Sequence, residues 1–121
     1  MAKGQVDSAV VVGAGAIGLE MAEALTDMWG IETSLVEMQD QVLPAAMGPD
    51  MANLVQSVLR ENEIEVHLNT QVEEFLGDPE TGVSAVKTSN REIPCQLVIL
   101  RVGNRPDSEL ASKCGLSLAP H

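Results

Sequence analysis

Three glycines and one acid are the residues of this chain whose spacing points most directly to chemistry. Gly13, Gly15 and Gly18 follow the pattern G-x-G-x-x-G directly after an apolar run, and an amphipathic stretch follows them. Glycine lets the backbone leave a strand sharply at Gly13, approach a diphosphate closely at Gly15 and press a helix against a sheet at Gly18. The order of strand, glycine turn and helix therefore predicts a site for the diphosphate of a dinucleotide.

The acid is Glu37, which ends the second apolar run 19 residues after Gly18 and is followed by Met38. An acid at this spacing accepts hydrogen bonds from the ribose hydroxyls of an adenosine. A helix that begins with Ala16 and Ile17 presents free N–H groups and the positive end of its dipole to the diphosphate. We therefore place all of these residues in the predicted site. The alternative is that Glu37 is an ordinary solvated acid, since the chain has 18 acidic residues.

The distribution of basic residues predicts which dinucleotide binds. No lysine or arginine lies between Lys3 and Arg60, so no base is available at the end of the second strand to bind a 2′-phosphate. Glu37 and Asp40 would repel that phosphate. We therefore expect NADH to be preferred over NADPH.

Hydrophobic periodicity predicts strands that alternate with helices, followed by a run of short strands. Strands are expected over residues 8–12, 31–37 and 64–68, helices over 16–29 and 49–59, and a loop over 39–48. This order implies right-handed crossovers and a parallel sheet. Turn residues separate three further strands, over 71–76, 83–88 and 91–94, which predicts an antiparallel meander. Residues 97–100 then predict a fourth buried parallel strand.

The two predicted helices carry apolar residues at helical spacing, which we expect to face the core. These residues are Ile17, Met21, Leu25 and Met28 on the first helix, and Met51, Leu54, Val55, Val58 and Leu59 on the second. Cys95 and Cys114 form neither a C-x-x-C pair nor a metal-ligand cluster, so both are expected to be small packing residues. We expect no metal site, and we expect His67 to be structural.

Acidic residues outnumber basic residues 18 to 7, and the formal net charge is -11. Such a charge repels nucleic acid and anionic membrane surfaces, so neither is expected as a partner. No apolar run approaches the length of a membrane span, and the N-terminal residues lack the apolar core of a signal peptide. We therefore expect a cytoplasmic protein.

Four stretches of the chain together carry a family resemblance. They are G-A-G-A-I-G-L-E-M-A-E-A-L at 13–25, V-E at 36–37, V-L-P at 42–44 and L-V-I-L-R-V-G-N-R-P-D at 97–107. The chain resembles the NAD(P)H-binding domain of flavoprotein pyridine nucleotide-disulfide oxidoreductases, such as lipoamide dehydrogenase, NADH oxidase and coenzyme A disulfide reductase. The resemblance implies an α/β fold with a Rossmann-like parallel sheet, in which a three-stranded antiparallel meander forms one crossover. It also implies that residues 1–121 form a single NADH-binding domain.

The resemblance further implies site residues and partners. Glu20 would lie near the nicotinamide end of the cofactor, with Val102 and Gly103 passing close to it; the alternative for Glu20 is an acid that the helix dipole stabilises. A larger homodimeric enzyme is implied, in which an FAD domain receives hydride from NADH. This chain contains no second glycine turn for FAD and no C-x-x-x-x-C pair. The segment itself is therefore expected to bind NADH without turnover, to have no catalytic residue and not to bind FAD.

Alternatives to this interpretation stay open. The chain is either part of that larger enzyme or a free-standing, non-catalytic NADH-sensing module. A small methyltransferase also combines a glycine turn with an acid, but Gly18, the meander and the Gly-x-Arg-Pro ending disfavour it. Arg101 replaces a residue that is small in many family members, and either crowds the nicotinamide site or pairs with an acid such as Glu20. His121 is expected to be a tag remnant rather than a ligand.

Overall fold

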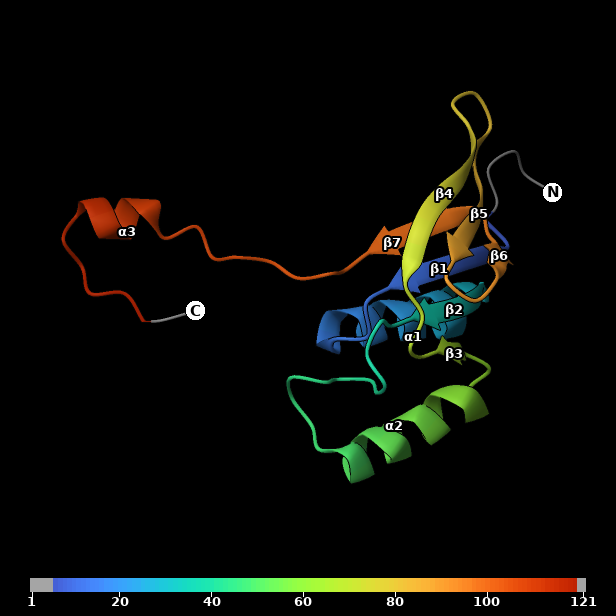
Figure 1. Ribbon diagram of the computed structural model, residues 1–121, viewed down its shortest axis with the longest axis horizontal. Helices are drawn as coiled ribbons and strands as arrows, with labels where there is room; N and C mark the ends of the chain where they lie inside the picture. The colour runs from blue at the N-terminus through green and yellow to red at the C-terminus, as the bar shows by residue number, and fades with distance from the viewer. Residues whose placement is uncertain (1–5, 120–121) are drawn as a thin grey trace.

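The computed structural model describes residues 6–119, and residues 6–100 form three layers (Figure 1). Two helices, α1 (Ala16–Trp29) and α2 (Pro49–Glu61), pack on one face of a four-stranded parallel sheet. The strands of this sheet are β1 (Ser8–Val12), β2 (Glu32–Val36), β3 (Glu65–His67) and β7 (Leu97–Leu100). Against its other face packs a three-stranded sheet of β4 (Val72–Asp78), β5 (Gly82–Thr88) and β6 (Glu92–Pro94).

The strands of the parallel sheet follow the order β3-β2-β1-β7. Val12, the last residue of β1, pairs with Val36 of β2 on one side and with Leu100 of β7 on the other. The predicted α/β fold with a Rossmann-like parallel sheet is confirmed, and the antiparallel strands connect β3 to β7. Ligands of open α/β sheets bind outside the carboxyl ends of the strands. The ends of β1, β2 and β7 are therefore the place to look for a site.

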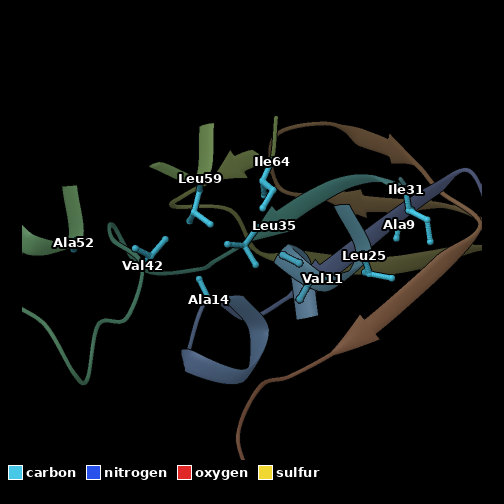
Figure 2. Packing of buried hydrophobic residues seen from close by; sticks show 11 residues of the cluster. Ala9, Val11, Ala14, Leu25, Ile31, Leu35, Val42, Ala52, Leu59 and Ile64 are labelled. Carbon is cyan, nitrogen blue, oxygen red and sulfur yellow. The ribbon is translucent and has the colours of Figure 1, made fainter. Parts of the chain in front are cut away.

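Alternate side chains of β1 face opposite layers, as expected for a strand that is buried on both faces. Ala9 and Val11 join the core formed with α1 and α2, whereas Val10 and Val12 join the core formed with the antiparallel sheet. Figure 2 shows the first core, in which Leu35 of β2 lies among side chains from the helices and from β1. Packing from both sides holds β1 in place, and with it the turn that follows.

The antiparallel sheet has the order β4-β5-β6, which confirms the predicted meander. Three side chains pack onto the parallel sheet from this side: Val86 of β5, Ile93 of β6 and Cys95, which directly follows β6. Cys95 is buried, and burial raises the pKa of its thiol. The prediction that both cysteines are packing residues is wrong for Cys114, which is exposed. It follows α3 (Glu109–Lys113), a five-residue helix that has no buried residue.

Helix α1 begins and ends where the sequence predicts, but its buried face is shifted and shares only Leu25 with the buried part of the predicted stripe. Gly30 ends it with φ of 62°, the predicted left-handed cap. The buried residues are Gly18, Ala22 and Leu25, whereas Ile17 and Met28 of the predicted stripe are exposed. Small side chains allow the helix to approach the sheet closely at its first turns. Close backbone approach, and not apolar spacing alone, therefore decides which face is buried.

Helix α2 also differs from prediction in part of its buried face, although Val55 and Leu59 pack in the core as predicted. It begins at Pro49 as predicted, and it buries Ala52, Gln56 and Leu59. Three residues of the predicted stripe are exposed, namely Met51, Leu54 and Val58. A buried hydrogen bond accompanies this orientation: Gln56 Oε1 accepts from the N–H of Val42 at 3.1 Å. Because a buried N–H needs a partner, this bond favours the orientation in which Gln56 faces inward.

Strand β7 pairs as predicted but is not buried as predicted. It lies at the edge of the sheet, where Leu97, Val98 and Ile99 are half-buried and Leu100 is exposed. An edge strand has a neighbour on one side only, which explains the exposure. In Figure 1 the chain after β7 extends away from the sheet and carries α3.

Two further sequence-based expectations concern the membrane and the last residue. Within residues 6–119, none of the helices has both the length and the apolar character that a membrane span needs. His121, expected to be a tag remnant, lies outside the described residues.

Candidate functional site

The three glycines of the turn between β1 and α1 meet three different surroundings. Gly13 has φ of +102°, and a Cβ there would overlap the carbonyl oxygen of Arg101, just after β7. A Cβ at Gly18 would overlap the carbonyl oxygen of Gly13, so the start of the helix presses against the turn. A Cβ at Gly15 would meet nothing within 4 Å, so the space in front of this residue is open. The predicted sharp turn at Gly13 and close packing at Gly18 are thus present.

Glu37 follows β2 and is only 7% exposed. Its Oε2 accepts a hydrogen bond from the N–H of Ala14 at 2.8 Å, and its Oε1 accepts one from the N–H of Gln39 at 2.9 Å. Its own N–H donates to the carbonyl of His67, and its carbonyl accepts from the N–H of Thr70. Glu37 therefore ties the glycine turn to the ends of β2 and β3. The alternative of an ordinary solvated acid is wrong.

The loop after β2 folds back against the glycine turn. The N–H of Leu43 donates to the carbonyl of Ala14 at 2.8 Å, and both Val42 and Leu43 are buried. Leu43 has φ of 50°, a left-handed conformation that costs a non-glycine residue about 1–3 kcal/mol and persists only where the surroundings hold it. The bonds to Ala14 and, through Val42, to Gln56 supply that restraint. They bring residues 44–46 to the mouth of the site.

A cavity of about 460 Å³ lies at the carboxyl edge of the parallel sheet. It is lined by the ends of β1, β2 and β7, by residues 43–46 of the loop and by residues 70–72, which lead into β4. Small-molecule sites commonly have volumes of about 300–1,000 Å³. Among the described residues that line it, only Glu37 and Arg101 carry charged side chains.

The cavity brings together seven of the ten predicted site residues. These are Gly13, Gly15, Ala16, Glu37, Met38, Val102 and Gly103. Gly18 is buried against the turn, while Ile17 and Glu20 are exposed on α1 and do not line the cavity. Contact of any of these residues with a ligand stays a prediction.

The cavity also contains residues to which the sequence analysis assigned no role. The stretch V-L-P at 42–44 was noted for its resemblance, and it marks the loop that lines one wall. Thr70 carried no such signal, because it lies in an irregular connection between two strands. Its buried hydroxyl donates to the carbonyl of Leu68 and accepts from Asn90 Nδ2, each at 2.8 Å. Only the tertiary structure places it at the site.

Arg101 lies at the far side of the cavity from Glu37. Its side chain is half-buried, and its Nη2 lies 3.4 Å from Asn104 Oδ1. None of the ion pairs formed within residues 6–119 joins Arg101 to Glu20. Of the two alternatives left open for Arg101, pairing with Glu20 is therefore not found, and crowding of a nicotinamide stays a prediction.

The fold and the site define the class of protein. A parallel sheet whose carboxyl edge carries a glycine turn, a helix N-terminus and an acid after the neighbouring strand is typical of an α/β domain of the Rossmann type. Comparison with known families makes this more specific. The chain belongs to the pyridine nucleotide-disulphide oxidoreductase family, whose model matches residues 1–121. The family resemblance stated from the sequence is thereby confirmed.

Similar proteins are NAD(P)H-related oxidoreductases. The chain is 43% identical over 108 residues to an NADH oxidase of Methanocaldococcus jannaschii, covering 89% of this chain and 23% of that protein. It is 40% identical to a crystallised FAD-dependent pyridine nucleotide-disulphide oxidoreductase from Desulfovibrio vulgaris, with a TM-score of 0.84 over 97% of this chain and 29% of the other. The chain spans about a quarter of the length of the curated relatives that it matches.

A third similar protein has been solved in two forms with two cofactors. The water-forming NADH oxidase from Lactobacillus brevis, bound to NADH, is 29% identical to this chain with a TM-score of 0.79, covering 96% of this chain and 25% of the oxidase. An engineered form of that enzyme, an NADPH oxidase bound to NADPH, has a TM-score of 0.78. It is 28% identical and likewise covers 96% of this chain and 25% of its own. Its five substitutions remove one aspartate and introduce two arginines.

Proposed function

We propose that this chain binds NADH and is the dinucleotide-binding part of an FAD-dependent pyridine nucleotide-disulfide oxidoreductase. The observation that carries the proposal is the cavity, which joins the glycine turn, Glu37 and the segment after β7 at one edge of the sheet. The cavity spans the carboxyl ends of three neighbouring strands, β2, β1 and β7, as an extended dinucleotide requires. Its lining is mostly apolar with few polar groups, as is usual for cofactor sites.

The strand order suggests how the cofactor lies. The adenosine ribose binds at Glu37, after β2, and the diphosphate lies over Gly15 and the N-terminus of α1. The nicotinamide then extends past β1 toward Val102 and Gly103, after β7. Each oxygen of the Glu37 carboxylate already accepts one backbone N–H, and a carboxylate oxygen has room for a second hydrogen bond. Both ribose hydroxyls therefore have an available acceptor.

The charge around Glu37 favours NADH over NADPH. Of the described residues that line the cavity, the one base is Arg101, which lies beyond β1 from Glu37. A 2′-phosphate at the adenosine ribose would lie beside the carboxylate with no cation to compensate it. The engineered L. brevis oxidase supports this reasoning, because its change to an NADPH oxidase removed an acid and added arginines.

In the whole enzyme, this part presents the nicotinamide to a flavin carried elsewhere in the protein. Leu100 and Val102, at the end of β7, are 55% and 78% exposed. Such an apolar rim beside the cavity suits coverage by a flavin-binding segment. The isolated chain binds NADH without turnover and does not bind FAD. Absence of flavin from the longer protein would favour the alternative, a free-standing NADH-sensing module.

Isothermal titration calorimetry of the 121-residue chain tests the cofactor preference. NADH, NADPH and FAD are each titrated into the same preparation at one ionic strength. We expect NADH to bind more tightly than NADPH, and FAD to give no binding heat. Equal or tighter binding of NADPH would contradict the charge argument, and absence of NADH binding would contradict the proposed function.

A gain-of-function substitution tests the same argument without disturbing Glu37. Met38→Arg places a base at an exposed position of the cavity wall next to Glu37. Because an exposed arginine pairs with a phosphate only moderately, we expect NADPH affinity to rise about 3- to 10-fold relative to NADH. The matched control is Met51→Arg, which makes the same change at an exposed position outside the cavity. An equal change in both variants would mean that net charge, and not position, is responsible.

A further inference from the structure

We propose that Arg101 makes the site discriminate between the two redox states of the cofactor, so that NADH binds more tightly than NAD⁺. The inference rests on the proposed function and adds a specificity-determining residue to it. The observation behind it is a separation of charge within the cavity. Glu37 and Arg101 are the two charged residues in its described lining, and they lie at opposite ends.

The register of the sheet defines these two ends. Val12 of β1 pairs with Val36 on one side and with Leu100 on the other. Glu37 and Arg101 each follow one of these partners directly, so they flank the glycine turn from opposite sides. The N–H of Arg101 donates to the carbonyl of Val12 at 2.7 Å, which holds its backbone at this position. A dinucleotide whose adenosine is at Glu37 therefore brings its nicotinamide half to Arg101.

Within the described part of the chain, no acidic side chain neutralises the guanidinium of Arg101. There its hydrogen bond is to the neutral amide of Asn104, at a long 3.4 Å. The salt bridges found within residues 6–119 involve His67, Lys87, Arg91 and Lys113, and none involves Arg101. Arg101 as a residue is half-buried, but its hydrogen bond to Asn104 is exposed, so water and salt screen the charge of the guanidinium in part. A full positive charge therefore acts at this end of the cavity.

The two redox states differ in charge at this same end. The oxidised nicotinamide ring carries one positive charge that the reduced ring lacks, whereas the adenosine and the diphosphate are identical in both. At the effective dielectric constant of about 20 that applies near a protein surface, two unit charges within about 10 Å of each other repel enough to change a dissociation constant about tenfold. Arg101 is therefore expected to weaken NAD⁺ binding about tenfold while leaving NADH binding almost unchanged.

The experiment measures dissociation constants of the 121-residue chain for NADH, NAD⁺ and ADP-ribose, which lacks the nicotinamide. Arg101→Gln removes the charge, and Arg101→Lys retains it. The control is Arg60→Gln, which removes one charge from an exposed position in the last turn of α2. We expect the ratio of the NAD⁺ to the NADH dissociation constant to fall about tenfold in Arg101→Gln only. The wild-type ratio should also fall as ionic strength rises.

Each contrary result has its own meaning. If Arg101→Gln weakens all three ligands by the same factor, Arg101 binds the shared diphosphate and the inference is overturned. An unchanged ratio in Arg101→Gln, or an equal change in Arg60→Gln, overturns it as well. In all of these cases the proposed function stands, because the ligands still bind. If the wild-type chain binds neither NADH nor ADP-ribose, the proposed function itself fails.

Discussion

Replacement of Glu37 by alanine should lower the free energy of unfolding of this chain more than the loss of an exposed acid does. The carboxylate accepts two backbone N–H bonds, and the two donors differ in their access to water. Ala14 is fully buried, so its N–H would be left without a partner, whereas Gln39 is exposed and water can replace its bond. Hydrogen bonds to charged groups contribute about 1.5–3 kcal/mol, so we assign about 3 kcal/mol to the Ala14 bond and about 1 kcal/mol to the Gln39 bond.

The expected loss in the free energy of unfolding is therefore about 4 kcal/mol, a large part of the roughly 5–15 kcal/mol that stabilises a domain. Urea denaturation followed by far-UV circular dichroism measures it, with the m-value as a check that the same surface unfolds. Asp40→Ala is the matched control, since Asp40 is an exposed acid three residues away and should change stability by less than about 0.5 kcal/mol.

A milder substitution keeps the test informative if Glu37→Ala does not fold. Glu37→Gln retains one side-chain oxygen, which can still accept the bond from Ala14, so its loss should be about 1–2 kcal/mol. If Glu37→Ala is no less stable than Asp40→Ala, the two bonds do not hold the turn and the reasoning is refuted. A stability loss of the expected size also means that weaker NADH binding in Glu37→Ala cannot by itself assign the ribose to this residue.

The remaining predictions concern the glycines and the cysteines. Gly18→Ala should lower the free energy of unfolding, measured by urea denaturation, by about 3 kcal/mol or more. The new Cβ would overlap the carbonyl oxygen of Gly13, which no rotamer change can move. A stability equal to that of the wild-type chain would contradict the packing at the turn. Gly15→Ala should leave stability within about 0.5 kcal/mol but lower NADH affinity, and unchanged affinity would place the diphosphate elsewhere. In the folded chain an alkylating reagent should modify Cys114 but not Cys95, because the thiol of Cys95 is buried and has a raised pKa. Cys95 should react only after urea unfolds the chain. Mass spectrometry detects both modifications, and modification of Cys95 in the folded chain would contradict its burial.

Much of the fold follows from short-range sequence patterns. The β-branched run of β1, the positive φ at Gly13 and the left-handed cap at Gly30 each express preferences of neighbouring residues. The turn residues between β4, β5 and β6 likewise predict an antiparallel meander from local chemistry alone. For this reason the element order and the place of the glycine turn could be predicted.

The buried faces of the helices could not be predicted in the same way. Apolar spacing favoured Met51, Leu54 and Val58 of α2, but the N–H of Val42 required the amide of Gln56 as a partner. That demand comes from a loop outside the helix, so no period within the helix contains it. The exposure of β7 has a similar origin, since its four apolar residues do not reveal that it forms the edge of the sheet.

The candidate site also has a part that the sequence predicts and a part that only the tertiary structure reveals. Sequence spacing alone predicted the glycines and Glu37 as candidate site residues, because each meets a local requirement of a turn or of a strand end. Strand order decided that Arg101, although distant from Glu37 in the sequence, lines the same cavity on the other side of β1. Strand order also places the Glu37 carboxylate where it accepts a hydrogen bond from the N–H of Ala14 and so holds the glycine turn. Contacts between distant residues depend on which strands become neighbours, and that is settled only when both faces of the sheet are buried together.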